Sequence, residues 1–207
     1  GKHEGFCVHY AIKANANPKV LNIIAQEGLG ADCVSGGEIR RCLETGFAPK
    51  KIVYAGVGKA DWEINLGLDK RIFCFNVESI AELEIINELA GKKGKIADIC
   101  FRINPDVGAH TNAKITTGLA ENKFGIDMHY MEAAIEEASK MEHVRFIGLH
   151  FHIGSQILDM SDFVALCNRI NEIQDQLERQ HIHIENINVG GGLGIDYVHP
   201  NRVPIPD

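Results

Sequence analysis

The chain has 207 residues, of which 45% are hydrophobic, so it can bury a sizeable core and suits one domain or one large part of a domain. Its 21 basic and 28 acidic residues give a formal net charge of −7, which argues against a nucleic-acid-binding surface, because such surfaces usually carry a basic excess. No apolar run approaches the roughly 20 residues of a membrane span, and the first residues lack the apolar core of a signal peptide. We therefore expect a soluble, cytoplasmic protein that acts on a small molecule.

Short apolar runs alternate with longer segments of helical periodicity along the chain. Strands are predicted at residues 6–13, 31–35, 52–56, 72–77, 97–104, 144–153 and 186–190. Between them, residues 79–89 and 163–177 have apolar side chains at steps of three and four, as amphipathic helices do. Repeated strand-helix units place their strands in parallel. The sequence therefore predicts an α/β fold, a (β/α)8 TIM-type barrel with about seven strands present and no visible eighth strand.

Two further stretches stand out from this regular alternation. The link at residues 105–129 is much longer than the others, and long loops inside compact domains tend to be functional, although an ordered insertion over the barrel mouth is the alternative. Residues 197–207 are proline-spaced and extended, so we expect the chain to stop inside a loop and to be a fragment.

Six widely spaced cysteines, none in a C-x-x-C pair, are typical of reduced and mostly buried thiols.

One lysine interrupts the first predicted strand. Lys13 lies in Tyr-Ala-Ile-Lys-Ala-Asn, among small and apolar residues. Burial would disfavour its ammonium form, and a neutral amine can condense with an aldehyde. The alternative is a strand lysine that lies at an edge or extends to water.

Two histidines alternate with apolar residues in the sixth predicted strand, which places His150 and His152 on one face. Because the apolar face should pack on helices, we expect both histidines to point into the barrel, with His152 nearest the mouth where barrel enzymes place their active sites. The pair could bind a metal, form a hydrogen-bonded core pair, or act in catalysis or ring stacking. The sequence offers no obvious third and fourth metal ligands.

Three consecutive glycines follow the seventh predicted strand, where barrels often bind phosphate. Gly190, Gly191 and Gly192 would let backbone N–H groups approach an anion, and Ser155 could add a hydroxyl. The run does not match a dinucleotide fingerprint, because Ile195 stands where a third spaced glycine is required. A plain turn is the alternative. A lysine amine, a phosphate-binding loop and a histidine at one barrel mouth together suggest pyridoxal phosphate.

Five separated motifs occur in a specific order along the chain. They are Y-A-I-K-A-N from Tyr10, A-D-C-V-S from Ala31, R-I-N-P from Arg102, H-I-G-S-Q from His152 and G-G-G from Gly190. This order resembles the barrel-type pyridoxal-phosphate decarboxylases of basic amino acids, which have an alanine-racemase-like barrel. The stretch at residues 108–125 resembles the diaminopimelate branch in particular, although Asn112 stands where that branch often has a second histidine.

The resemblance implies a cofactor and a role for each matching residue. Lys13 and His152 would be catalytic and would also bind pyridoxal 5'-phosphate. The phosphate group would be bound by Ser155 together with Gly190, Gly191 and Gly192. Asp32 and Arg102 would complete the cofactor site, supported by Ser35 and Glu38. The cofactor accepts the electrons left when a carboxylate leaves the substrate, while the protein orients that bond. The implied reaction is the decarboxylation of meso-2,6-diaminopimelate to L-lysine and CO2, the last step of bacterial lysine biosynthesis.

The family also has features that this sequence lacks. They are an acidic residue that contacts the pyridine nitrogen, an arginine in a glycine-containing motif and a C-terminal β domain. The family also forms homodimers in which the partner subunit completes each active site. We therefore expect residues 1–207 to be one truncated pyridoxal-phosphate-binding barrel domain that does not turn over substrate by itself.

Three other functions are consistent with parts of the pattern. The same chemistry could act on ornithine, arginine or carboxynorspermidine, although the loop at residues 110–125 argues against it. A catalytically silent binding protein of the same fold is a second possibility, against which stand the retained Lys13 and His152. The third is a metal-dependent barrel hydrolase that uses His150 and His152.

Overall fold

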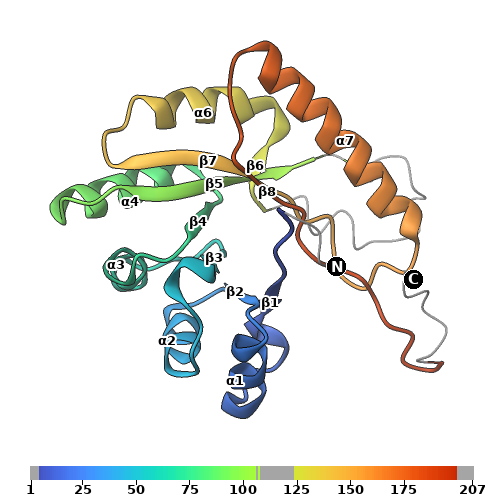
Figure 1. Ribbon diagram of the computed structural model, residues 1–207. Helices are drawn as coiled ribbons and strands as arrows, with labels where there is room; N and C mark the ends of the chain where they lie inside the picture. Colours follow the sequence, from blue (N-terminus) through green and yellow to red (C-terminus); the bar gives the residue numbers. More distant parts are fainter. Residues whose placement is uncertain (1–4, 106, 108–123, 200–207) are drawn as a thin grey trace. The chain divides into compact units, whose positions relative to one another are not determined.

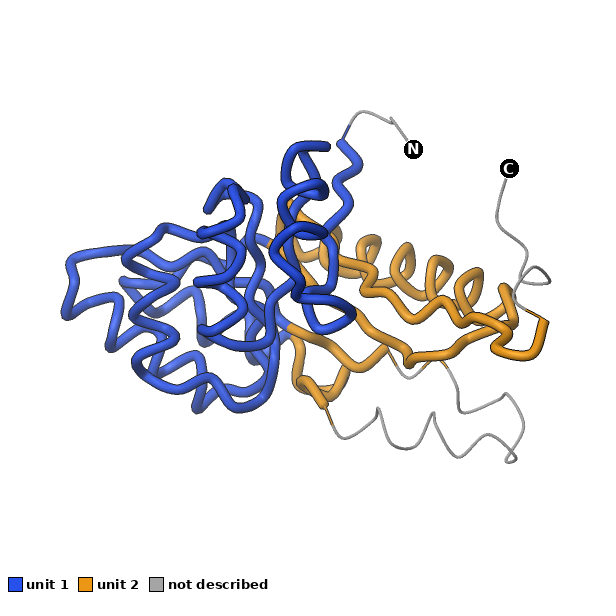
Figure 2. Tube along the Cα trace, turned by 90° about the horizontal axis from the view of Figure 1, so that it is seen from below, with its two compact units in different colours: residues 1–101, 132–147 blue, residues 102–131, 148–207 orange. Residues whose placement is uncertain are grey.

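The structure is a computed structural model that describes residues 5–105, 107 and 124–199, in which strands and helices alternate (Figure 1). The chain divides into two compact units (Figure 2). The first comprises residues 1–101 and 132–147, and the second comprises residues 102–131 and 148–207. None of the described helices is long and apolar enough to cross a membrane.

The strands of the sheet pair in parallel and follow one another in the order of the chain. They are β1 (His9–Ala11), β2 (Gly30–Cys33), β3 (Ile52–Tyr54), β4 (Cys74–Val77), β5 (Ala97–Asn104), β7 (Val144–His150) and β8 (Asn186–Asn188), with the short β6 (Ile126–Asp127) paired to β5. All seven predicted strands are present. A run of parallel strands connected mostly by helices is an incomplete (β/α)8 TIM-type barrel, so the predicted fold class is confirmed.

Helices connect most of these strands. They are α1 (Pro18–Gln26), α2 (Gly36–Glu44), α3 (Asp61–Lys70), α4 (Ile80–Lys92), α6 (Met131–Ser139) and α7 (Met160–Arg179), with 3-10 turns η1 (Ile12–Ala14), η2 (Pro49–Lys51) and η3 (Met128–Tyr130). The helices predicted at residues 79–89 and 163–177 correspond to α4 and α7. At the start of α4, Ser79 Oγ accepts a hydrogen bond from Glu82 N at 3.2 Å, which satisfies an N–H group that has no partner within the helix.

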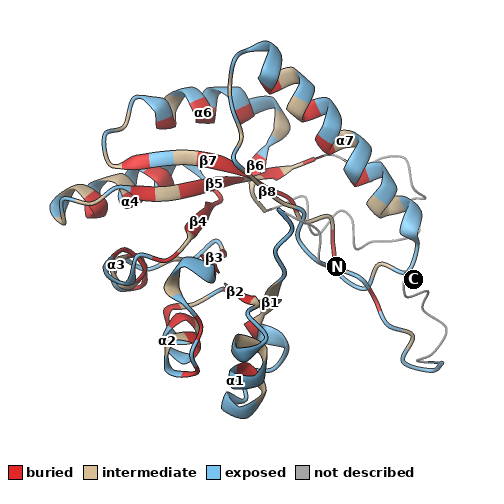
Figure 3. Cartoon of the chain, viewed as in Figure 1, coloured by how far each residue is buried: buried red, intermediate tan, exposed pale blue. Residues whose placement is uncertain are grey.

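The core of the first unit lies between its strands and helices. Every residue of β3 and β4 is buried, as expected for parallel strands that are covered on both faces (Figure 3). Val53, Cys74, Cys100 and Ile147 form one buried cluster. All six cysteines are free, and four of them are buried, but Cys7 and Cys167 are exposed, so the expectation of buried thiols holds for only part of the set.

Two predicted strands are too long at the ends that matter for function. The first ends at Ala11, which pairs with Asp32, and the chain then enters η1 at Ile12, so Lys13 lies in a 3-10 turn and not in a strand. The sixth ends at His150, which pairs with Asn188, the last residue of β8, so His152 lies beyond the strand.

The long link predicted at residues 105–129 contains β6, which the sequence did not reveal because a two-residue strand has no visible periodicity. The residues that carry the diaminopimelate-type pattern, 108–123, lie outside the described part of the chain.

Candidate functional site

In the second unit, the segments that follow β7 and β8 are joined by main-chain hydrogen bonds. Phe151 N donates to Asn188 O at 2.8 Å, and Ile157 N donates to Gly192 O at 2.9 Å. Gly194 N then donates to Ile157 O at 2.8 Å. These bonds continue the pairing of β7 and β8 beyond the strands and hold the two loops close together at the carboxyl ends of both strands.

Within the run of three glycines, two positions require glycine. A Cβ at Gly190 would lie 2.4 Å from Phe151 O and 3.0 Å from His152 Nδ1, and a Cβ at Gly192 would lie 2.1 Å from Gly154 O. Both glycines also have positive φ angles, +72° and +109°. A Cβ at Gly191, by contrast, would meet no atom within 4 Å. The main chain at Gly191 therefore faces open space, where its polar groups are accessible to a ligand.

The second unit thus brings together the predicted phosphate-binding residues. His152 is half-buried beside Gly190, and Ser155 is exposed directly after Gly154, the residue that Gly192 approaches. A glycine loop with open space at its centre and a neighbouring exposed hydroxyl fit the phosphate group of pyridoxal phosphate. Arg102, in the same unit, is half-buried with its guanidinium carbon 5.2 Å from the centre of the Phe124 ring.

The metal-binding interpretation of the histidine pair gains no support from its surroundings. His150 is 6% exposed, whereas His152 is half-buried. Among the residues that the structure describes, no three or more His, Cys, Asp or Glu side chains gather in a group that could hold a metal ion. Two ligands alone are fewer than structural or catalytic zinc sites use.

The first unit carries the other predicted site residues, Lys13 and Asp32. Lys13 is exposed in this chain. The prediction that burial favours its neutral amine is therefore wrong for this chain. Asp32 is half-buried in β2 and pairs in register with Ala11, the last residue of β1. The supporting residues Ser35 and Glu38 form the start of α2: Ser35 Oγ accepts from Glu38 N at 3.2 Å, and Glu38 Oε2 accepts from Val34 N at 2.7 Å.

A buried polar network that the sequence pattern does not indicate lies at the carboxyl ends of β3 and β4. The Lys59 side chain is 1% exposed, and its Nζ donates to Gly56 O at 2.7 Å, Asn76 O at 2.8 Å and Glu82 Oε1 at 2.6 Å. The ammonium also lies 5.3 Å from the centre of the Tyr54 ring. Burial raises the pKa of the Glu82 carboxyl, although the charge of Lys59 opposes this. A lysine with these partners holds the loops after β3 and β4 in place.

A second carboxylate in the same unit connects two helix starts. Glu63 Oε2 accepts from Ala60 N at 2.9 Å, and Oε1 accepts from Gly36 N at 2.7 Å, at the first residue of α2. Burial acts to raise the pKa of Glu63, but the hydrogen bonds from Ala60, Gly36 and Tyr54 outweigh it, so the pKa is lowered overall. Glutamate three residues after a helix start is a signal that the sequence contains at Glu63 and also at Glu38 and Glu82.

Known proteins resemble this chain over nearly all of its length. Residues 3–204 match the family described as pyridoxal-dependent decarboxylase, pyridoxal binding domain. The chain is 70% identical over 206 residues to a diaminopimelate decarboxylase of Bacteroides thetaiotaomicron, which covers 100% of this chain and 53% of that protein. It is 43% identical over 197 residues to a diaminopimelate decarboxylase of Aquifex aeolicus, covering 95% of this chain and 47% of that protein.

Solved structures agree with the sequence comparison. The crystal structure of diaminopimelate decarboxylase from Methanocaldococcus jannaschii has a TM-score of 0.90 and 44% sequence identity, and the match covers 96% of this chain and 46% of that chain. The chain thus spans about half the length of the curated relatives it matches. From the match to residues 3–204, we conclude that the chain belongs to the family of pyridoxal-dependent decarboxylases and carries their pyridoxal-binding domain.

Proposed function

We propose that the whole protein catalyses the pyridoxal-phosphate-dependent decarboxylation of meso-2,6-diaminopimelate to L-lysine and CO2, the last step of lysine biosynthesis. The observation that carries this proposal is the glycine loop of Gly190, Gly191 and Gly192, held against His152 and Gly154 in a chain 70% identical to a diaminopimelate decarboxylase. The chemistry that such a cofactor supplies when bound is an electron sink for the bond that breaks.

Each candidate residue has a task that suits its place in its own unit. The exposed amine of Lys13 is accessible for covalent attachment of the cofactor and for its release to a substrate amine. His152, half-buried beside Gly190, would fix the plane of the pyridine ring. Ser155 and the main chain at Gly191 would bind the phosphate. Asp32 and Arg102 would complete the cofactor site.

The proposal extends to the assembly of the protein. The residues 1–207 would form one barrel domain, and a C-terminal β domain together with the second subunit of a homodimer would supply the remaining contacts to the substrate. The protein would work in the cytoplasm on a small amino acid. It would bind neither nucleic acid nor a membrane.

Cofactor binding is tested by an absorbance spectrum of the protein mixed with pyridoxal 5'-phosphate, with Lys13→Ala as the control. We expect a visible band of covalently bound cofactor that is lost in the variant. A band of equal height in Lys13→Ala would contradict the assigned role of Lys13. No band in the full-length protein would contradict the cofactor site itself.

Substrate choice is tested by side-by-side decarboxylation assays of the full-length protein. We expect kcat/KM for meso-2,6-diaminopimelate to exceed the values for ornithine, arginine and carboxynorspermidine by about 100-fold or more, because a site built to bind a distal carboxylate rejects analogues that lack it. A higher value for any of these three would replace the proposed substrate while leaving the cofactor chemistry in place. The chain by itself should show no steady turnover.

A further inference from the structure

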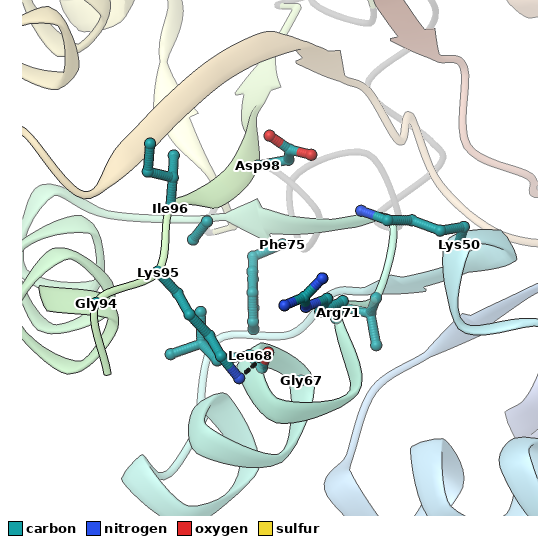
Figure 4. Close-up of a pocket in the computed structure, with 11 residues that line it drawn as sticks. Lys50, Gly67, Leu68, Arg71, Phe75, Gly94, Lys95, Ile96 and Asp98 are labelled. Carbon is teal, nitrogen blue, oxygen red and sulfur yellow. Dashed lines mark hydrogen bonds between the residues drawn. The ribbon is translucent and has the colours of Figure 1, made fainter. Parts of the chain in front are cut away.

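A cavity of about 290 Å³ opens in the first unit at the amino-terminal ends of β4 and β5 (Figure 4). Its wall includes the end of α3, at Leu68 and Arg71, and residues that lead into β5, among them Ile96. Asp32 and the last residue of β1 lie at the opposite, carboxyl edge of the same sheet. The cavity therefore uses none of the residues proposed to bind the cofactor.

The end of α3 has a conformation that favours glycine but carries arginine. Arg71 has a φ of +54°, and Ile72 N donates to Gly67 O at 3.2 Å, the hydrogen bond that closes a helix with a left-handed residue. A side chain in this backbone region is strained, and strained residues cluster where they bind ligands. Gly67 lets the Phe75 ring approach the helix, since a Cβ there would lie 2.7 Å from the ring. The strained residue Arg71 is also one of the residues that line the cavity.

Two cations at the cavity have no partner in the described part of the chain. Neither Lys50 nor Arg71 makes a side-chain hydrogen bond or ion pair with any described residue, and both extend toward Phe75 in the close-up (Figure 4). The one acidic residue in the wall, Asp98, accepts from Arg145 Nε at 2.8 Å, so its carboxylate already has a cationic partner outside the wall. The cavity keeps an excess of positive charge.

The third cation of the wall is already engaged. Lys95 Nζ donates to Leu68 O at 2.9 Å and to Asp69 Oδ1 at 3.0 Å, so it satisfies a carbonyl at the end of α3 and a carboxylate outside the cavity. An incoming anion would consequently meet Lys50 and Arg71 first. The guanidinium of Arg71 can donate two parallel hydrogen bonds to one carboxylate.

The remainder of the wall is apolar. Leu68 and Phe75 form its buried part, and the Ile96 side chain at the rim is 64% exposed. Ligand-binding cavities commonly combine such an apolar lining with a few polar groups that fix orientation, and this volume lies near the lower end of their range. A ligand that suits these surroundings is small and has one anionic end and one apolar end.

We propose that this cavity binds a small amphipathic carboxylate, with its carboxyl group paired to Arg71 and Lys50 and its apolar body packed on Leu68 and Ile96. The proposal goes beyond the decarboxylase function and does not depend on it, because its residues and its readout are separate from the cofactor site.

Methyl NMR of the natural full-length protein, with labelled Ile and Leu side chains, tests the proposal with hexanoate as the probe. We expect saturable shifts at the methyl groups of Leu68, Ile72 and Ile96, with hexanoate binding about tenfold more tightly than acetate because its chain buries apolar surface. Hexylamine and inorganic phosphate should shift these methyl groups far less. Equal binding of phosphate would replace the amphipathic ligand with a general anion, and equal binding of hexylamine would overturn the role of the two cations.

Three variants locate the anionic contact. Arg71→Gly accepts the left-handed backbone and should weaken hexanoate binding about tenfold, the effect of losing a charge-assisted hydrogen-bond pair. Lys50→Gln should weaken it to a smaller extent. Lys70→Gln removes the same charge one residue before Arg71, outside the cavity wall, and should leave binding unchanged. Unchanged affinity in both Arg71→Gly and Lys50→Gln, or an equal loss in Lys70→Gln, would refute the proposed site.

Discussion

The loops after β3 and β4 in the first unit and those after β7 and β8 in the second unit are held in different ways. In the first unit, the charged side chains of Lys59, Glu63 and Glu82 reach main-chain groups of neighbouring loops. In the second unit, the main chains bond to each other directly, and Gly190 and Gly192 remove the side chains that would keep them apart. The first arrangement depends on charge, and the second depends on volume.

This difference suits the role that we propose for each region. A main chain that must itself contact an anion needs accessible N–H groups, and side chains in that position would cover them. A main chain that only supports its neighbours can have its N–H groups satisfied by carboxylates, as at Gly36 with Glu63. Substitutions that change charge should therefore damage the first unit, and substitutions that add volume should damage the second.

The largest loss in the free energy of unfolding is expected from Lys59→Met. Removing one partner of a buried ion pair leaves Glu82 and two carbonyl groups without their donor, which typically costs about 3–5 kcal/mol of the free energy of unfolding. Urea unfolding of the full-length protein measures this loss. Lys92→Met, which removes an exposed lysine paired with Glu88 on the surface of α4, should cause no measurable change.

A double variant identifies the cause of that loss. In Lys59→Met with Glu82→Gln, the uncompensated carboxylate is replaced by a neutral amide that can still accept from Glu78 N, so part of the lost stability should return. If Lys59→Met alone is as stable as the Lys92→Met control, the buried network does not hold these loops.

The second prediction concerns volume in the glycine loop. Gly192→Ala adds a Cβ 2.1 Å from Gly154 O at a φ of +109°, so we expect a loss of about 2–3 kcal/mol and of the visible cofactor band. Gly191→Ala adds the same methyl group in open space and should change the free energy of unfolding by less than about 0.5 kcal/mol. Equal losses in the two variants would show that loop flexibility, and not close approach, determines stability here.

The sequence predicted the second region better than the first. Three consecutive glycines after an apolar run are visible without a structure, although only the close approaches of Phe151 to Gly190 and of Gly154 to Gly192 show which glycines are indispensable. Lys59 lies in an ordinary loop of the sequence, and its burial depends on Asn76 and Glu82, which are distant in the chain. Contacts between distant residues leave no local pattern, so this network could not be predicted from periodicity.

The ends of strands were the other limit of prediction. The seven apolar runs identified every described strand except the short β6, since parallel strands inside a sheet are largely apolar. The first strand stops at Ala11 because the chain turns into η1 at Ile12, and a run of apolar residues that continues through Ile12 does not contain that information. The sequence therefore predicts a buried strand position for Lys13, which lies exposed in the 3-10 turn after β1.

The third prediction uses pH to separate charge from volume. The folded-state pKa of Glu63 is lowered, so its contribution to stability is present above the unfolded-state value of about 4.3 and is lost as the pH falls through the folded-state pKa. Glu63→Gln should cost about 1–2 kcal/mol at pH 7, and its difference from the unmodified protein should shrink as the pH falls below about 5. A difference that stays constant or grows on acidification would contradict the assigned hydrogen bonds from Ala60 and Gly36.

The smallest changes in stability are expected from alanine substitutions of two serines, Ser79 and Ser155, which should differ in their effect on cofactor binding. Ser79 accepts from Glu82 N at the start of α4, so Ser79→Ala should cost about 1 kcal/mol and leave cofactor absorbance unchanged. Ser155 is exposed and has no hydrogen bond within the described residues, so Ser155→Ala should change the cofactor-free protein by less than about 0.5 kcal/mol. Its affinity for pyridoxal phosphate should nevertheless fall about tenfold, through loss of one hydrogen bond to a charged group. A Ser155→Ala protein that loses stability but keeps its cofactor affinity would show that this serine supports the loop and does not bind the phosphate.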